Sequence, residues 1–212
     1  MSDFLKVLNE RTSVEHFDAA TPISVHEIKE LISEACQAPS SFNIQHWRFI
    51  AVTDERIRER LKGTTIAPNQ ERVATAPLIF LILGDLNGHK RLEGILDETV
   101  HAGLLPREVA DVWLTMANGT YGSDPRLARD EAIRSASLAA MTLMLAAGNR
   151  GYVSCPIGFN PVQDGDPEHQ RSLCTRHDAR GWSSRCRELR AQTAASRRPG
   201  CYVQRLTEVR MG

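Results

Sequence analysis

Apolar and polar residues alternate with the helical period in two N-terminal segments. The first helix is expected from Asp3 to Asn9 and the second from Val25 to Gln37. Ser24 and Glu27 stand three residues apart at the start of the second helix, which is the spacing of a capping box. Pro39 disfavours helical backbone at the residue before it, so this helix is expected to end ahead of a loop.

Two strand patterns follow this loop. The first covers Arg48 to Thr53, after which Asp54 is expected to cap a charged, exposed helix from Glu55 to Lys62. The second covers the apolar residues Leu78 to Leu83. Because these residues show no alternation with polar ones, they predict a strand that is buried on both faces.

The longest helical pattern of the chain begins after residue 123. Asp124 is the expected N-cap and Pro125 the first-turn residue of a helix of about 25 residues. Its residues Leu138 to Ala147 carry no charge on any face. A helix that is apolar all round must be enclosed by the core of its own chain or by another chain. Ahead of it, residues 87–122 have helical spacing and predict two further helices.

Composition and charge favour small-molecule chemistry in a single domain. A chain of 212 residues can bury a substantial core. Because 26 basic residues balance 26 acidic ones, no net field points to nucleic acid or to an anionic membrane. The longest apolar runs are too short to span a bilayer, and the N-terminal residues lack the pattern of a signal peptide. We therefore expect a cytoplasmic protein that binds neither nucleic acid nor membranes.

The stretch from Ala38 to Val52 combines the end of a helix, a polar loop and the start of a strand. Within it, hydroxyl and amide groups that both donate and accept hydrogen bonds are carried by Ser40, Ser41, Asn43 and Gln45. Such groups suit the edge of a heterocycle. The alternative interpretation is an ordinary helix-to-strand connection with serine caps.

A second candidate site lies where the first helix ends, at Arg11, Thr12 and Ser13. A guanidinium followed by two hydroxyl groups can bind a phosphate through charge-assisted hydrogen bonds. A surface arginine followed by a turn of threonine and serine is the competing interpretation. The pattern alone does not decide between the two.

These stretches resemble sequence motifs of the FMN-dependent nitroreductase family. The loop matches the family's signature A-P-S-S-x-N-x-Q-x-W-x-F, and Arg11, Ser13 and Phe17 match its N-terminal R-x-S-x-(R/K)-x-F. The polar and basic residues before the second strand, and the turn from Gly151 to Phe159, are similar to two further motifs in the same order. The resemblance covers residues 3–159.

The resemblance implies an α+β fold of the nitroreductase type, with a mostly antiparallel sheet flanked by helices. It also implies a homodimer, in which the long central helix packs at the subunit interface and one FMN binds at each interface. Small residues such as Ala139 and Ala147 would let the helices approach closely. No G-x-G-x-x-G or Walker motif occurs in the chain, so a Rossmann or P-loop protein has no support.

The resemblance also assigns roles to individual residues. Arg11 and Arg205 would bind the FMN phosphate, with support from Ser13. The loop of the partner subunit would contact the ring or the ribityl chain. Arg72 is the candidate cation near flavin N1 and C2=O, because Glu15 stands where the family usually has a second basic residue. The candidate FMN-binding residues are Arg11, Thr12, Ser13, Pro39, Ser40, Ser41, Asn43, Asn69, Gln70, Arg72, Pro156, Ile157, Gly158 and Arg205.

The activity that the resemblance implies is FMN-dependent NAD(P)H oxidoreduction in two steps. NADH or NADPH would give a hydride to flavin N5 and leave, after which a nitroaromatic, a quinone or a similar acceptor takes the electrons. The cofactor carries this chemistry, so no side chain is assigned as a catalytic residue. The alternative is a non-catalytic flavin-binding protein of the same fold, in which Glu15 and an altered C-terminal segment have removed turnover.

The residues after Phe159 differ in character from the rest of the chain. They contain many arginines and no lysine, and they predict no buried strand, whereas the family has an apolar strand in this region. Two hypotheses stay open: residues 160–199 are read in a shifted frame, or the tail has diverged. His169, Cys174 and His177 lack a fourth ligand, so no metal site is expected.

Overall fold

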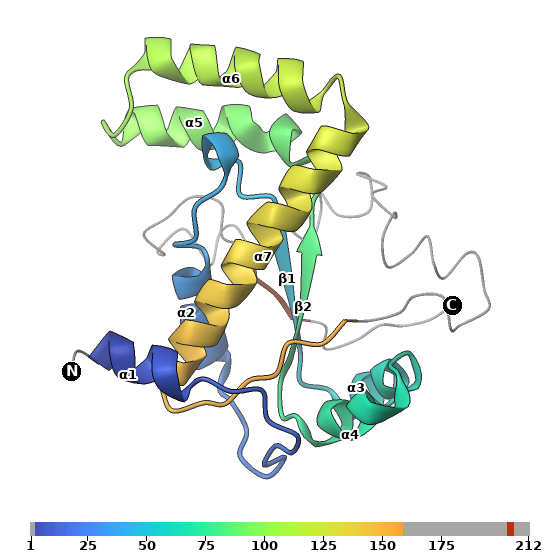
Figure 1. Ribbon diagram of the computed structural model, residues 1–212. Coiled ribbons are helices and arrows are strands. Elements are labelled where there is room, and N and C mark those ends of the chain that lie inside the picture. Colours follow the sequence, from blue (N-terminus) through green and yellow to red (C-terminus); the bar gives the residue numbers. More distant parts are fainter. Residues whose placement is uncertain (1–2, 159–202, 206–212) are drawn as a thin grey trace.

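An antiparallel pair of strands and one long helix organise the fold. The structure is a computed structural model that describes residues 3–158 and 203–205 (Figure 1). Strand β1 (Trp47–Val52) pairs antiparallel with β2 (Ile79–Gly84) over the whole length of both strands. Helix α7 (Pro125–Asn149) crosses one face of this strand pair. With 25 residues, α7 is about 37 Å long and exceeds the length of the strands.

A third strand, β3 (Val203–Arg205), pairs in parallel with the other edge of β1, so the strand order is β2-β1-β3. The apolar pattern predicted no buried strand after residue 159, yet three residues there join the sheet through their backbone. A strand edge offers unpaired backbone groups to any extended segment, whatever its side chains. The other tail residues lie outside the described part of the chain, and with them the frame-shift hypothesis and the His169, Cys174 and His177 set.

Helices cover one face of the β1–β2 pair and both of its ends. α1 and α2 lie beside α7, α5 and α6 lie together near the end at which β1 begins, and α3 and α4 lie at the other end (Figure 1). The elements are α1 (Asp3–Glu10), α2 (Val25–Ala35), α3 (Glu55–Gly63), α4 (Ala67–Thr75), α5 (Leu92–His101), α6 (Arg107–Tyr121) and the short 3-10 helices η1 (Ser41–Asn43) and η2 (Gly88–Arg91).

Cap residues that the sequence predicted begin several helices. Ser24 Oγ accepts from the Glu27 amide at 3.2 Å, and the Glu27 carboxylate accepts from the Ser24 amide at 2.9 Å, which is the predicted capping box. The Ser24 hydroxyl, the Tyr152 hydroxyl and the Ser24 amide all donate to this carboxylate and lower the pKa of Glu27 to about 2. Asp54 and Asp124 accept from first-turn amides of α3 and α7.

Several element boundaries differ from the prediction by one or two residues. Helix α2 ends at Ala35, not at Gln37, because the Gln37 and Ala38 amides bond to carbonyls three residues back, at 3.0 and 3.2 Å. This tighter hydrogen bonding is typical of the last turn of a helix. Strand β1 begins and ends one residue earlier than expected.

Strand β2 is half-buried, although its sequence predicted burial on both faces. Phe80 and Ile82 pack against apolar residues of α2 and α7, but no residue from Ile79 to Leu83 is fully covered. The prediction was therefore wrong within the described residues. α7 covers one face of the strand (Figure 1). The absence of alternating polar residues had predicted a covering layer on the other face as well.

Two apolar clusters form the core, and the loop before β1 joins them. The first lies between α2, β1 and α7, and the second lies beneath α5 and α6. Ala38, at the start of the loop, belongs to the first cluster, whereas Ile44, near its end, belongs to the second. Both ends of the loop are therefore anchored in hydrophobic core.

Only part of the apolar surface of α7 is covered by its own chain. Ala139 and Leu143 are buried against the first cluster, but Leu138 is 42% exposed. α1 crosses the same helix, with Val7 Cγ1 only 3.1 Å from the position of a Cβ at Gly148. α1 also exposes Phe4, by 59%. None of the described helices combines the length and the apolar character that a membrane span requires.

Candidate functional site

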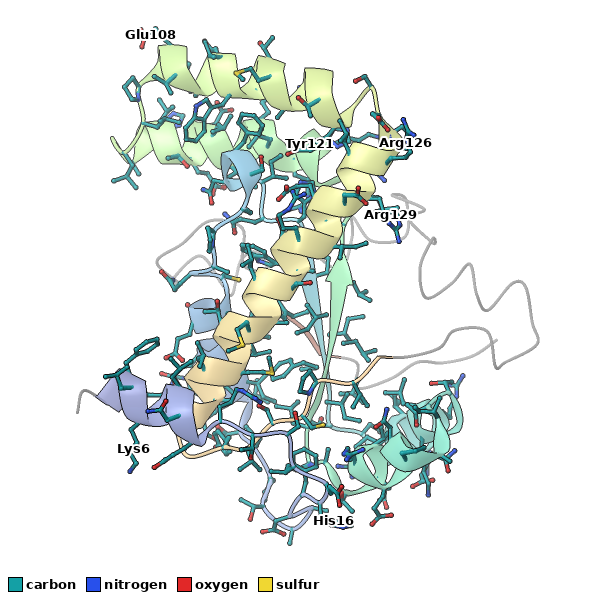
Figure 2. All side chains as sticks on the ribbon, in the orientation of Figure 1. Lys6, His16, Glu108, Tyr121, Arg126 and Arg129 are labelled. Atoms are coloured by element: carbon teal, nitrogen blue, oxygen red, sulfur yellow. The ribbon has the colours of Figure 1, made fainter. Side chains whose placement is uncertain are left out.

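The predicted site residues fall into two groups at opposite ends of the β1–β2 pair. The first group lies on residues 11–17, on α4 and on the turn 151–158, and the second on the loop 38–46. Strand β1 runs from the loop toward α3 and α4, and its six residues span about 20 Å. Figure 2 shows the same separation, because His16 of the first group and Tyr121, which contacts the loop, lie at opposite ends of the molecule.

A backbone contact brings the N-terminal motif to the turn after α7. Ser13 and Ser154 form an isolated parallel β-bridge. Arg11 is half-buried at the end of α1, and its guanidinium makes no hydrogen bond or ion pair with any residue that the structure describes. Thr12 and Ser13 beside it are exposed. This arrangement leaves a cation and two hydroxyls available for an anionic ligand.

Arg72 is, by contrast, largely occupied by its own chain. Its Nε donates to the Val14 carbonyl at 3.2 Å, and Nη1 donates to the Pro68 carbonyl and to Asn69 Oδ1, both at 2.9 Å. Nη2 lies 3.5 Å from the Glu15 carboxylate. A guanidinium has five N–H donors, so one of them is left for a ligand among the described contacts. Arg72 therefore ties the N-terminal segment to α4.

The other predicted residues of the first group lie nearby. Asn69 Oδ1 is held by Arg72, and Gln70 Nε2 donates to the Thr65 carbonyl at 3.4 Å. In the turn after α7, Pro156 and Gly158 are exposed. Their backbone is therefore accessible to a ligand.

The second group lies on a loop with unusual backbone geometry. Phe42, Asn43 and Gln45 have φ values of 50°, 56° and 56°, in the left-handed region of backbone conformation that residues other than glycine rarely adopt. Ser40 Oγ accepts from the Gln45 amide at 2.9 Å and closes the loop on itself. Pro39 and Asn43 are exposed, and Ser40 and Ser41 are half-buried. Strain of this kind persists only where surrounding contacts determine the conformation.

A buried polar network supports the end of this loop. Asp85, which is 3% exposed, accepts from Arg48 Nη2 at 2.7 Å and from Arg91 Nη2 at 3.2 Å. Arg91 also donates to the Gln45 carbonyl at 3.3 Å. His46 Nδ1 donates to the Asp85 carbonyl at 2.9 Å, and burial lowers the pKa of His46, so its ring is neutral at pH 7.

Two residues that contact the loop were not predicted as hydrogen-bonding partners. Tyr121, near the end of the helices predicted in residues 87–122, donates to Ser41 Oγ at 2.8 Å. Glu131, in the second turn of α7, accepts a hydrogen bond from the Ser41 amide at 3.4 Å. One signal for Glu131 was present in the sequence: it shares helical spacing with Ala128 and Ser135 on the inward face of α7, where a charge is unexpected.

Two further expectations concern the tail and metals. The backbone of Arg205 lies opposite Ala51 in the sheet, but its side chain is outside the description of the chain. Within residues 3–158, no group of three His, Cys, Asp or Glu side chains is arranged to hold a metal ion.

Comparisons with known proteins identify the family. A model of the nitroreductase family matches residues 8–174. YodC of Bacillus subtilis (strain 168), provisionally named an NAD(P)H nitroreductase, is 38% identical over 164 residues, or 77% of this chain and 80% of YodC. Protein DrgA of Synechocystis sp. (strain ATCC 27184 / PCC 6803 / Kazusa) is 38% identical over 159 residues, or 74% of this chain and 72% of DrgA.

A solved structure agrees. The crystal structure of a provisionally named nitroreductase from Exiguobacterium sibiricum 255-15, in complex with FMN, is 30% identical and aligns with a TM-score of 0.73 over 84% of this chain and 83% of that one. The chain therefore belongs to the nitroreductase family, and its α+β fold is the nitroreductase fold predicted from the motifs.

The Arg72 contacts generate a prediction about stability. Arg72→Lys should lower the free energy of unfolding by about 1–3 kcal/mol, because a lysine cannot replace the donors to Val14 and Asn69. Chemical denaturation of the purified protein measures this change. Glu15→Gln is the control and should change stability by less than about 0.5 kcal/mol, since the Glu15 side chain is 76% exposed. An effect of Arg72→Lys no larger than that of Glu15→Gln would contradict a stabilising role for the Arg72 hydrogen bonds to Val14 and Asn69.

Proposed function

We propose that this protein is an FMN-dependent NAD(P)H oxidoreductase that reduces nitroaromatics, quinones or similar acceptors. The observation that carries the proposal is the Ser13–Ser154 bridge, which joins two motifs far apart in sequence beside an Arg11 guanidinium that no described residue neutralises. A cation next to two hydroxyls fits a terminal phosphate. Family membership and the FMN-bound relative support a flavin mononucleotide over other phosphorylated ligands.

Bound FMN would supply the redox chemistry, taking a hydride from NADH or NADPH in one half-reaction and reducing the acceptor in the other. The protein would hold and orient it. Arg11, Thr12 and Ser13 would bind the phosphate, together with Arg205 if its side chain reaches the same place. Asn69, Gln70, the remaining donor of Arg72 and the backbone from Pro156 to Gly158, Ile157 included, would face the ring.

We also propose that the site is shared between two subunits of a homodimer. The roles implied by the motifs place Arg72 and the loop serines Ser40 and Ser41 on the same flavin, yet these residues lie at opposite ends of β1 within one protomer. One flavin ring cannot reach both ends of a six-residue strand. A second protomer could bring its loop to the first protomer's Arg72. The exposed Leu138 on α7 and Phe4 on α1 supply apolar surface for such an interface.

The positive charge of Arg72, where the flavin ring would bind, is partly offset by Glu15. Glu15 lies 3.5 Å from Arg72 Nη2, and its negative charge opposes the guanidinium. A cation near N1 and C2=O stabilises the charge that accumulates there in the reduced cofactor. The Glu15 contact therefore favours a second candidate, a flavin-binding protein that does not turn over.

A reduction experiment separates the two candidates. Purified protein reconstituted with FMN should be yellow and should lose its visible absorbance when NADH or NADPH is added without oxygen. Addition of a quinone or a nitroaromatic should then restore the absorbance. A yellow protein that neither nicotinamide bleaches would support the non-catalytic candidate, and a folded protein that binds no FMN would contradict both.

The phosphate assignment makes a quantitative prediction. Arg11→Ala should raise the Kd for FMN about 10- to 100-fold, because a hydrogen bond to a charged group contributes about 1.5–3 kcal/mol. Titration of the flavin-free protein with FMN, followed by quenching of flavin fluorescence, measures the Kd.

Arg56→Ala is the matched control for this prediction. Arg56 lies exposed on α3, and its side chain forms no ion pair with the described residues, so the substitution removes the same charge away from the candidate site. The control should leave the Kd unchanged within about twofold. If Arg11→Ala binds FMN as tightly as Arg56→Ala does, Arg11 is not part of the phosphate site.

A further inference from the structure

We propose that Glu131 is a positioning residue that holds the loop 39–45 from α7 and so fixes how its serines meet the cofactor. The Glu131 carboxylate binds the amide of Ser41, one of the candidate flavin contacts. The loop assignment rests on the proposed function, whereas the contact itself belongs to the structure. Neither the motifs nor the family comparison identifies Glu131.

The burial of Glu131 requires an explanation. The residue is 4% exposed and sits on the face of α7 that carries Ala128, Ala132 and Ala136, all buried. Removing a carboxylate from water costs several kcal/mol unless its oxygens find partners. An apolar side chain at this position would pack against the same alanines without that cost. The hydrogen bonds that the Glu131 carboxylate accepts therefore explain why a charged residue occupies this buried position.

Glu131 has three partners, and one of them belongs to the loop. Ser135 Oγ, one turn along α7, donates to Oε1 at 2.7 Å, and the Arg134 guanidinium pairs with the other oxygen. Arg134 is 63% exposed, so water replaces it readily. The Ser41 amide donates to Oε1 at 3.4 Å across 90 residues of sequence. Ser135 belongs to α7 itself, and water can take the place of Arg134. Ser41 is therefore the one of these three partners that ties Glu131 to another part of the fold.

Other contacts hold the same point of the loop. Tyr121, at the end of α6, donates to Ser41 Oγ at 2.8 Å. The ring of Phe42 makes edge contacts with Trp113 and Tyr121, each with ring centroids 6.3 Å apart. The amide of Ser41 is thus held by α7, and its hydroxyl and the next side chain are held by α6.

The loop needs these external contacts because its internal hydrogen bonds do not fix its direction. The Asn43 and Ile44 amides bond to the Ser40 and Ser41 carbonyls, and the Gln45 amide bonds to Ser40 Oγ. These bonds maintain the turn and the core anchors its two ends, but neither supplies a partner for the Ser41 amide. Left-handed backbone at three loop residues is also unfavourable and needs support from outside the turn.

The position of Glu131 on α7 gives this contact a further consequence. α7 is the helix whose exposed Leu138 we assign to the subunit interface. A loop tied to α7 keeps a fixed place relative to the partner subunit, whose flavin the loop would contact. Glu131 would therefore lower the entropy cost of flavin binding without touching the flavin.

Hydrogen–deuterium exchange on the flavin-free dimer or monomer, whichever the protein forms, tests the positioning role directly. In Glu131→Ala the loop amides 41–45 should exchange at least about tenfold faster than in the wild type, since they lose one charged hydrogen bond. Glu131→Gln keeps an acceptor oxygen for the Ser41 amide and should restore slow exchange. This readout does not depend on whether FMN is the ligand.

Ser135→Ala is the matched control. It removes a buried hydrogen bond to the same carboxylate without touching the loop. It should lower the melting temperature, as Glu131→Ala does, but leave exchange of residues 41–45 unchanged. If Glu131→Ala is too unstable to purify, Glu131→Leu provides the second variant, because an apolar side chain suits this buried position but offers the Ser41 amide no acceptor.

FMN titration of the same variants distinguishes the inference from the proposed function. If the wild type binds FMN, the Kd should rise about tenfold in Glu131→Ala and stay near the wild-type value in Glu131→Gln and Ser135→Ala. Wild-type protein that binds no FMN defeats the proposed function but leaves the exchange result to decide on Glu131. Loop exchange in Glu131→Ala or Glu131→Leu that matches the wild type would overturn the positioning role.

Discussion

The packing of α7 across the paired strands β1 and β2 is the constraint on which the rest of the structure depends. The two elements approach so closely that a Cβ at Gly84 would lie 2.9 Å from the Ala132 carbonyl oxygen. This contact fixes the helix against the end of β2, next to the loop that precedes β1. Because the helix is longer than the strands, its two ends reach both groups of candidate site residues. Glu131 contacts the loop, and the turn after α7 delivers Ser154 to Ser13.

The two arginines of the first group differ in how the chain uses them, and this difference assigns their roles. Arg72 spends four of its donors on Val14, Pro68, Asn69 and Glu15, so it is mainly a structural tie with a reduced positive charge. Arg11 has no such partner among the described residues and keeps its full charge for a ligand. A phosphate site beside Arg11 is therefore better supported than strong stabilisation of the ring by Arg72.

Local patterns in the sequence predicted the elements well, because caps and periodicity depend on near neighbours. The Ser24–Glu27 capping box, the Asp54 cap and the helix beginning at Pro125 all formed where expected. Contacts between distant segments could not be predicted in this way. Nothing near Arg72 in sequence shows that Val14 and Glu15 would take its donors, because that depends on how the N-terminal segment packs against α4.

The half-burial of β2 and the pairing of β3 were missed for a related reason. An apolar run such as Ile79 to Leu83 predicts that its side chains will be buried. It does not indicate which layer of the fold, or which chain, buries them. β3 pairs through backbone groups that are the same in every residue, so its side-chain pattern carries no signal. The loop serines were recognised from their chemistry, whereas the carboxylate that holds Ser41 lies 90 residues away.

A mixed dimer tests the shared site most directly. One protomer would carry Arg11→Ala and the other Ser40→Ala with Ser41→Ala, each set first shown to abolish tight FMN binding in its own homodimer. If each site takes its phosphate group from one subunit and its loop from the other, the mixed dimer has one site with both elements intact. It should bind one FMN per dimer with the wild-type Kd, measured by titration of the purified heterodimer. A mixed dimer that binds no FMN with wild-type affinity would contradict the shared site, since both elements would then belong to the same subunit.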